Sequence, residues 1–276
     1  MDEILKIKDV YKSFGEKKIL DGLSFDVPRN SVFGFVGRNG AGKTTTMKLI
    51  LGLYKADAGE IFINGKKVKY GQNDTNKYIG YLPDVPEFYG YMKPAEYLRL
   101  CADITNIPKE KVDDRINEML AMVGLEKDNK RINGFSRGMK QRLGIAQALL
   151  AKPELLICDE PTSALDPAGR KEILDILKAV SEHTTVIFST HILSDVERIC
   201  DNVAILNNGR IAWNGNIAQV REMGGNKSFT AEFASNEDMN KALNAIKTQN
   251  IDIVKLEMKD SNLEKLFMEV IGNETD

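Results

Sequence analysis

The stretch GRNGAGKT at residues 37–44 restricts the possible folds more than any other part of this chain. It matches the pattern G-x-x-x-x-G-K-S/T, follows the apolar run SVFGFV at 31–36, and precedes a segment with helical spacing. A continuous apolar run is typical of a strand that is buried on both faces, as in a parallel sheet. The order strand, glycine-rich turn and helix therefore predicts an α/β fold built on a parallel sheet.

The chemistry of this turn predicts a site for phosphate groups. Its glycines let the backbone curl so that successive N–H groups point inward at an anion, and the following helix N-terminus adds partial positive charge. Lys43 supplies a full charge, and Thr44 offers a hydroxyl to Mg²⁺, which prefers oxygen ligands. The plain alternative is a glycine-rich turn with a surface lysine. The residues assigned to the nucleotide are Gly37, Arg38, Asn39, Gly40, Ala41, Gly42, Lys43, Thr44 and Thr45.

Two carboxylates close a second buried-strand candidate, LLIC at 155–158. We expect Asp159 to hold the metal through water and Glu160 to polarise an attacking water molecule. One well-placed base is enough, because positioned cations and donors stabilise most of the charge on a transferring phosphoryl group. An acidic pair at a strand end also serves as a helix N-cap. The phosphate-binding pattern upstream favours the catalytic interpretation.

The N-terminal part of the chain has the pattern of antiparallel strands. Residues 4–10 and 23–28 alternate apolar and polar side chains, with turn signals at Gly15 and at Asp21-Gly22. Asn-Gly follows an alternating run within 59–70, which is a strong hairpin signal. These segments predict an antiparallel β-subdomain.

Helical spacing dominates the middle of the chain, with Pro94 and Pro108 at expected first turns. We predict an inserted α-helical subdomain over about 85–150. Another apolar run at 185–190 is separated from the strand before Asp159 by a helical segment, which is the βαβ order of a parallel sheet.

The end of the chain differs in composition from the rest. Residues 203–206 and 210–215 predict two further strands at the sheet edge. Beyond them, 222–276 carry six lysines and eleven carboxylates, so this segment has a charge of −5 and leaves +3 on 1–221. We predict one domain over 1–221 and a small C-terminal extension over 222–276 whose role the sequence does not indicate.

The composition excludes several classes of protein. The chain has 38 Lys and Arg against 40 Asp and Glu, so no strongly basic surface points to nucleic acid. Three cysteines without a CxxC motif and two histidines disfavour disulfides and structural zinc. The first residues lack a signal-peptide pattern, and no apolar run reaches the roughly 18 residues of a membrane helix. We expect a cytosolic chain.

Three further motifs complete a family pattern: FSRGMKQR at 135–142, SALD at 163–166 and STH at 189–191. Together with the two phosphate motifs, they resemble the nucleotide-binding subunit of ATP-binding cassette (ABC) transporters over residues 3–220. The resemblance implies a P-loop NTPase cassette of the α/β class. Such a cassette has a RecA-like core, an N-terminal antiparallel β-subdomain and an inserted α-helical subdomain. It also implies ATPase activity with ATP and Mg²⁺.

The same resemblance implies that two copies face each other head to tail around ATP. Ser136 and Gly138 would then reach the γ-phosphate in the other copy, Asp166 would lie at the dimer seam, and His191 would contact the γ-phosphate. Phe14 falls where the family stacks a ring on adenine. Simpler roles are open for three of these residues: His191 as a structural histidine, Phe14 as a core residue, and Ser136 as a helix N-cap.

The chain departs from the family pattern at two places. Phe135, Arg137 and Met139 replace three residues of the usual Leu-Ser-Gly-Gly-Gln signature, and Asp84 stands where members carry a glutamine that binds the metal or its water. A carboxylate binds Mg²⁺ at least as well, so we assign Asp84 to the metal with Thr44. These changes resemble the subgroup that serves ABC-2-type membrane proteins, often exporters, as does the tail NLEKLFMEV at 262–270.

Aromatic residues are concentrated at 78–97, where they make up six of twenty positions. Tyr and Phe are enriched at protein interfaces. Because the family receives a helix of its membrane partner near here, we predict that Phe88, Tyr89 and Tyr91 line a docking groove. The alternative is that they form the core of the helical subdomain.

The resemblance therefore implies an ATP-hydrolysing subunit that powers transport, in the export direction, through a separate integral membrane permease. We expect a second ATP-binding subunit, most simply an identical copy, and a peripheral position on the cytoplasmic face of the cell membrane. The alternative is a soluble ATPase of the same superfamily that acts on ribosomes or DNA. It is disfavoured because such members usually carry two cassettes or a long coiled coil, and the chain lacks an excess of basic residues. Intact Lys43, Asp159, Glu160 and His191 disfavour an inactive cassette.

Overall fold

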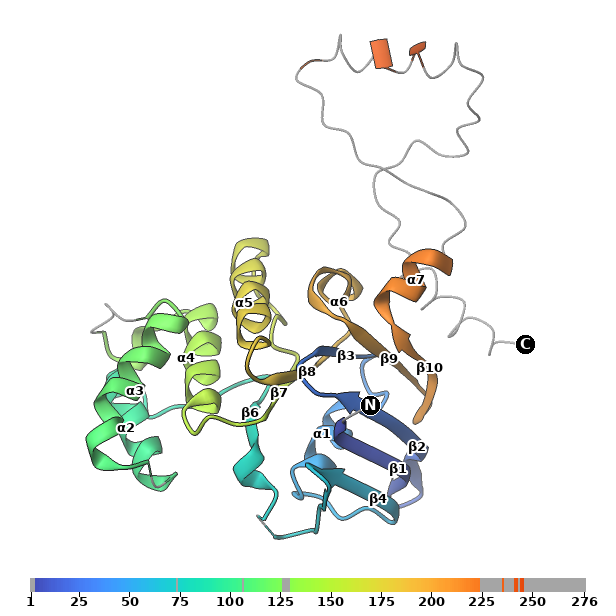
Figure 1. The fold of residues 1–276 in the computed structure, drawn as a ribbon, viewed down its shortest axis with the longest axis horizontal. Coiled ribbons are helices and arrows are strands. Elements are labelled where there is room, and N and C mark those ends of the chain that lie inside the picture. The colour runs from blue at the N-terminus through green and yellow to red at the C-terminus, as the bar shows by residue number, and fades with distance from the viewer. Residues whose placement is uncertain are drawn as a thin grey trace.

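The described part of the chain forms two sheets with helices around them and a helical lobe at one end (Figure 1). The predicted extension over 222–276 lies almost wholly outside the described residues, as does its tail motif, so the boundary at 221 stays a prediction. No helix within the described part is long and apolar enough to cross a membrane. This computed structural model describes residues 3–72, 74–105, 107–125 and 130–223, together with 235, 241–242 and 244–245.

The larger sheet has six strands in the order β10-β9-β3-β8-β7-β6. All neighbours are parallel except β10 and β9, and every residue of β3, β7 and β8 is buried. This confirms the α/β class and the buried strands that the apolar runs predict. The strands are β3 (Val32–Gly37), β6 (Ile79–Leu82), β7 (Leu155–Asp159), β8 (Thr185–Thr190), β9 (Asn202–Asn207) and β10 (Arg210–Asn216).

The smaller sheet is antiparallel and has the order β2-β1-β4-β5. Phe25 of β2 stacks on Phe33 and Phe35 of β3, with ring centroids 5.6 and 5.1 Å apart, so one apolar core joins the two sheets. The Asn64-Gly65 hairpin is confirmed. The strands are β1 (Glu3–Phe14), β2 (Lys17–Pro28), β4 (Ala58–Ile63) and β5 (Lys66–Lys67).

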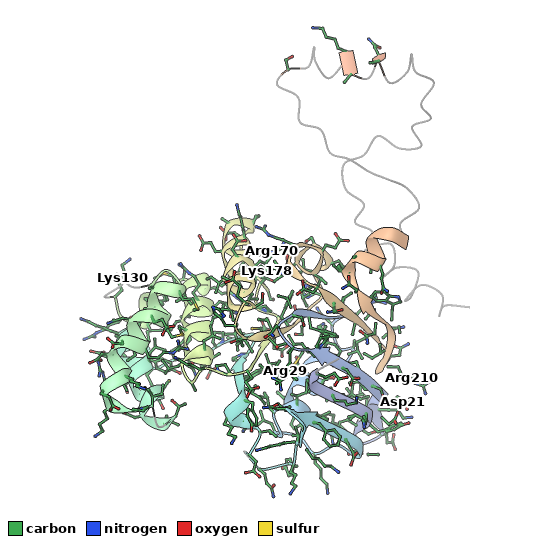
Figure 2. All side chains as sticks on the ribbon, viewed as in Figure 1. Asp21, Arg29, Lys130, Arg170, Lys178 and Arg210 are labelled. Carbon is green, nitrogen blue, oxygen red and sulfur yellow. The ribbon has the colours of Figure 1, made fainter. Side chains whose placement is uncertain are left out.

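The turn predicted at Asp21-Gly22 is wrong. The hairpin between β1 and β2 turns at Gly15, and β2 continues through both residues. Two residues of β2 here oppose one residue of β1, which makes a β-bulge, and Gly22 adopts a positive φ of 72°. The bulge carries a contact between the sheets: Arg210 of β10 donates to Asp21 Oδ2 through Nη2 at 2.6 Å and through Nε at 3.0 Å (Figure 2).

The prediction that both C-terminal strands lie at the edge is wrong for β9. It pairs with β3 on one side and β10 on the other. Its apolar run VAIL is fully buried, as is typical of an interior strand, whereas β10 alternates exposed and half-buried residues.

The helices occupy two regions. Helices α2 (Pro94–Ile104), α3 (Lys109–Met122) and α4 (Arg137–Leu149) form the lobe beyond β6, and α4 packs against that strand (Figure 1). The predicted helical character is confirmed, including Pro94 in the first turn of α2 and Pro108 just before α3. The other elements are α1 (Lys43–Ile50), α5 (Pro167–Val180), α6 (Leu193–Ile199) and α7 (Ile217–Met223), with short 3₁₀ turns at Asn76–Tyr78 and Ile132–Gly134.

Candidate functional site

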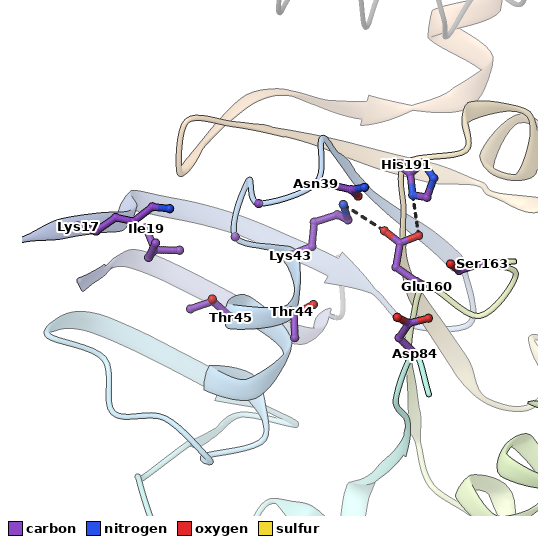
Figure 3. Close-up of a pocket in the computed structure, with 12 residues that line it drawn as sticks. Lys17, Ile19, Asn39, Lys43, Thr44, Thr45, Asp84, Glu160, Ser163 and His191 are labelled. Carbon is purple, nitrogen blue, oxygen red and sulfur yellow. Dashed lines mark hydrogen bonds and ion pairs between the residues drawn. The ribbon is translucent and has the colours of Figure 1, made fainter. Parts of the chain in front are cut away.

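A cavity of about 490 Å³ lies where four parallel strands end and α1 begins (Figure 3). Parallel α/β sheets place ligands at this edge, because the carboxyl ends of their strands and the helix N-termini meet there. Motifs that are far apart in the sequence follow β3, β6, β7 and β8, so the topology brings them together. The cavity is lined by Lys17, Ile19, Asn39, Gly40, Gly42, Lys43, Thr44, Thr45, Asp84, Glu160, Ser163 and His191.

The glycine-rich turn forms one wall of the cavity. Gly42 has a φ of 112°, and a Cβ there would meet the Leu20 side chain at 2.8 Å, so the position requires glycine. No side chain caps the N-terminus of α1, which begins at Lys43. The first N–H groups of this helix are therefore left for an anionic ligand.

Lys43 lies at the centre of the cavity with its side chain almost fully buried. Its Nζ donates to the carbonyl oxygens of Gly37 at 2.7 Å and Arg38 at 3.2 Å, and it lies 3.1 Å from Glu160 Oε1 (Figure 3). A buried ammonium group must be paired with hydrogen-bond acceptors or charges. The loop and Glu160 fill that role in this structure, and phosphate oxygens are equivalent acceptors.

Glu160 joins the strand motif to His191. Its Oε2 lies 2.9 Å from His191 Nδ1, so one carboxylate bridges the lysine and the histidine (Figure 3). Glu160 adopts a left-handed conformation with a φ of 48°, and its N–H donates to the Ser189 carbonyl and hydroxyl, both at 3.1 Å. Non-glycine residues rarely take this conformation, and it is found at functional sites.

A buried network supports the loop that follows Glu160. Thr162 Oγ1 donates to Asp195 Oδ2 at 2.7 Å, and Arg170 Nη2 donates to Asp195 Oδ1 at 2.6 Å. Thr162 and Asp195 are buried. Sequence reasoning missed this network because its members are separated by up to 33 residues and match no motif.

Asp84 lies on the opposite wall of the cavity from the glycine-rich turn (Figure 3). Burial raises the pKa of its carboxyl, Arg137 opposes this, and the charges of Asp159 and Glu160 add to the rise. Arg137 Nη2 lies 3.4 Å from Asp84 Oδ1. A carboxyl with a perturbed pKa that lines a cavity is a candidate functional residue.

Several predicted site residues do not line this cavity. Ser136 accepts a hydrogen bond from the Met139 N–H at 3.2 Å and caps α4, and Asp166 caps α5 through the Gly169 N–H at 3.0 Å. Ser136 therefore has the capping role that was the alternative to a ligand contact. A capping residue can still contact a ligand. The predicted residues outside the lining are Phe14, Gly37, Arg38, Ala41, Ser136, Gly138, Asp159 and Asp166.

Two of these residues, Asp159 and Phe14, differ sharply in burial. Asp159 is buried and accepts a hydrogen bond from the Ser189 hydroxyl. Phe14 is 46% exposed, and its ring meets Tyr54 edge-on with centroids 5.3 Å apart. Phe14 is therefore not a core residue of the antiparallel sheet, and the Lys12 ammonium lies over its ring, 5.1 Å from the ring centroid.

Three lining residues were not predicted: Lys17, Ile19 and Ser163. Lys17 and Ile19 lie among the first, turn-proximal residues of β2. They reach the cavity because this part of β2 packs against Gly42 of the glycine-rich turn through Ile19 and Leu20. Ser163 belongs to the SALD motif, and that motif was the available signal for it.

Comparison with known proteins agrees with this geometry. The sequence model of a family described as "ABC transporter" matches residues 20–163. The chain belongs to this family. The uncharacterised ABC transporter ATP-binding protein YxlF of Bacillus subtilis (strain 168) is 43% identical, over 82% of this chain and 76% of its own length. The bacitracin transport ATP-binding protein BcrA of Bacillus licheniformis is 35% identical, over 100% of this chain and 99% of its own length.

Solved structures of the ABC family show the same fold. One described as the ATP-binding subunit of an ABC transporter has a TM-score of 0.72 and 32% identity, over 87% of this chain and 99% of its own. The cbiO1 protein of Clostridium perfringens, part of the ABC transporter complex cbiONQ, has a TM-score of 0.74 and 26% identity, over 90% of this chain and 97% of its own. ABC transporter ATP-binding proteins are ATPases, so the predicted family, cassette fold and enzyme class are confirmed.

The aromatic residues predicted to bind a partner divide into two groups in this ABC cassette. Phe88 is half-buried and packs against the helical core, with its ring 5.1 Å from the buried Tyr97. Tyr89 and Tyr91 are 55% and 66% exposed, and their ring centroids lie 6.0 Å apart. Part of the aromatic excess therefore belongs to the lobe's own core, and Tyr89 and Tyr91 form an exposed pair at its surface.

Proposed function

We propose that this chain is the subunit of an ABC transporter that binds and hydrolyses ATP and thereby drives export through a separate integral membrane permease. The observation that carries the proposal is the meeting of Lys43, Glu160 and His191 in one cavity at the N-terminus of α1. A relative that aligns over almost its whole length, named for bacitracin transport, supports a role in transport. Export follows from the resemblance of Asp84 and Arg137 to the ABC-2-type subgroup.

In this proposal Lys43 exchanges its carbonyl partners for the β- and γ-phosphates of ATP. The Oε1 atom of Glu160 then loses its ion pair with Lys43 and becomes available to accept a proton from water. His191 Nδ1 lies 2.9 Å from the other carboxylate oxygen and fixes the orientation of the base. General bases that are held in this way accelerate reactions by about 10²–10⁴-fold.

The residues around the cavity fit a magnesium ion. Thr44 and Asp84 line the cavity, Asp159 is buried at the end of the strand before Glu160, and all three supply hard oxygen donors. Mg²⁺ in nucleotide sites keeps several waters and takes one or two carboxylates together with phosphate oxygens, so an open site of this kind suits it. When bound, the ion neutralises charge on the phosphates.

We propose that a second copy of the chain faces this cavity. Ser136 and Gly138 stand at the N-terminus of α4, where a helix favours anions, yet neither lines the cavity of its own chain. In a head-to-tail pair they would complete the other copy's site, with Asp166 near the seam. Phe14 would stack on adenine. The permease would bind at Tyr89 and Tyr91, with the complex on the cytoplasmic face of the membrane.

The test is ATP binding and hydrolysis by the full-length chain, followed by reconstitution with the integral membrane protein that co-purifies with it. We expect saturable ATP binding, Mg²⁺-dependent hydrolysis, and a higher rate in the reconstituted complex. Lys43→Ala should weaken ATP binding by about 10–100-fold, since a hydrogen bond to a charged group contributes about 1.5–3 kcal/mol. Lys111→Ala on α3 is the control, because Lys111 is exposed and does not line the cavity. ATP affinity unchanged by Lys43→Ala, or no binding at all, would contradict the proposal.

A further inference from the structure

Asp84 is connected to the amino end of α4 at two points. Its backbone carbonyl accepts a hydrogen bond from Gln141 Nε2 at 2.7 Å, and its carboxylate pairs with Arg137 at 3.4 Å. Asp84 itself follows β6 and lines the cavity. Asp84 thus connects the proposed ligand site to α4, the helix that begins within the signature motif.

The two connections differ in strength. Gln141 is buried, and within the described part of the chain its Oε1 has no hydrogen-bond partner. The bond from its Nε2 to Asp84 therefore offsets part of the cost of burying the amide and will not be given up easily. The pair between Arg137 and Asp84 is exposed, with side chains 43% and 46% accessible. Exposed pairs of this kind contribute little and are easily broken.

Arg137 is the first residue of α4 and directly follows the N-cap Ser136. Its ion pair links the first turn of the helix to a side chain in the cavity. Gln141, one turn further on, holds the backbone of Asp84 in place. A ligand that attracts the Asp84 carboxylate can therefore break the ion pair while the backbone of Asp84 stays where it is.

We propose that Arg137 is a positioning residue that holds the Asp84 carboxylate at the edge of the cavity until a nucleotide-bound divalent cation competes for it, and that this exchange frees the first turn of α4. The inference rests on the proposed function, because it requires a nucleotide and its cation in the cavity. The Asp84 carboxylate cannot bind the cation and keep its ion pair with Arg137 at the same time. By linkage, Arg137 weakens cation binding as much as the cation weakens the pair with Arg137.

The experiment measures the affinity of the full-length chain for a fluorescent ADP analogue, mant-ADP, with Mg²⁺ and with EDTA. The ratio of the two affinities reports how much the cation contributes, and ADP excludes turnover. We expect Arg137→Gln to raise this ratio by about 2–5-fold, the range that corresponds to an exposed ion pair. Asp84→Asn should lower the ratio. Adding Arg137→Gln to Asp84→Asn should then have no further effect, because the competing carboxylate is gone.

The matched control is Lys140→Gln, which removes the same charge from the same helix three residues further on. It should leave the ratio unchanged. Arg137→Gln acting equally with and without Asp84, or Lys140→Gln having the same effect, would overturn the proposal in favour of general electrostatics. Failure of the wild-type chain to bind mant-ADP would contradict the proposed function itself, and the two failures are therefore distinguishable.

Hydrogen exchange of the α4 first turn provides the second readout. Addition of Mg²⁺ to the ADP-bound chain should increase exchange in peptides that cover 137–141. In the Arg137→Gln variant, exchange should already be high and should not respond to the ion. Unchanged or slower exchange in the wild-type chain would overturn the release of α4.

Discussion

Glu160 is held at three points before any ligand enters the cavity: by Lys43 at one carboxylate oxygen, by His191 at the other, and by Ser189 at its backbone N–H. Its left-handed backbone conformation directs the side chain into the cavity. When ATP takes over Lys43, the contacts with His191 and Ser189 remain and keep the base oriented. The orientation of the proposed base is therefore set by contacts of single residues.

Asp84 gives a prediction that depends on pH. Burial is the largest influence on its carboxyl and raises the pKa above the ordinary 3.8. The folded chain thus binds this proton more readily than the unfolded chain, and the carboxyl lowers stability as pH rises through its folded pKa. Asp84→Asn should raise the Tm in EDTA at pH 7, with a gain that shrinks as the pH falls toward 3.8. A lower Tm at pH 7 would mean that the Arg137 pair outweighs burial.

The sequence predicts the residues of the site that lie within short motifs. The glycine-rich turn, Glu160 and His191 follow strands, and the topology of a parallel sheet places them together. Asp195 and Gln141 could not be predicted, because each acts on a residue far away in the sequence through a contact that only the packed fold creates.

At the scale of elements, the loop after Glu160 depends on the packing of α5 against α6. Asp195 of α6 receives hydrogen bonds from Thr162 of the loop and Arg170 of α5. Helix α5 packs against β8, the strand that His191 follows, and α6 packs against β3. This one carboxylate therefore links the loop after Glu160 to both helices.

Asp195→Asn keeps the shape of the side chain and removes the charge opposite Arg170. We expect a loss of about 1–3 kcal/mol in the free energy of unfolding, below the figure for a fully buried pair because the Arg170 side chain is 28% exposed. Denaturant unfolding of the variant and the wild-type chain measures this difference in the free energy of unfolding. Asp175→Asn is the control, since Asp175 joins the same two helices through an exposed pair with Arg198 and should cost less than about 1 kcal/mol. Equal losses in the two variants would contradict this role of Asp195.

The order of elements was predictable, and their exact pairing was not. Apolar runs identified β3, β7 and β8, and Pro94 marked the start of α2. The bulge at Gly22 looked like a turn because glycine serves both, and only the register of β1 against β2 distinguishes them. The apolar run VAIL in β9 was a signal for an interior strand, but no sequence pattern shows which strands pair with it on either side.

At the scale of the whole molecule, the lobe of α2, α3 and α4 is joined to the cavity through Asp84 and presents aromatic rings at its surface. Phe88 packs on the core of the lobe, so its loss would affect folding. Tyr89 and Tyr91 are largely exposed. They are the residues that can be changed without opening the core.

The double variant Tyr89→Ala and Tyr91→Ala should reduce capture of the membrane partner by about 10-fold, since tyrosine is enriched among the interface residues whose truncation costs more than about 1 kcal/mol. Its ATP hydrolysis in the absence of the partner should stay near the wild-type rate. The control is Tyr70→Ala, another exposed tyrosine, which lies outside the lobe. Full capture by the double variant would remove these two residues from the docking surface.

The central claim is that Glu160 acts as the base in a cavity that binds ATP through Lys43, and single-turnover hydrolysis by Glu160→Gln tests it most directly. With ATP affinity measured on the same protein, we predict binding close to that of the wild-type chain and hydrolysis slower by about 10²–10⁴-fold. Hydrolysis within a few-fold of the wild-type rate, at equal ATP occupancy, would contradict the account.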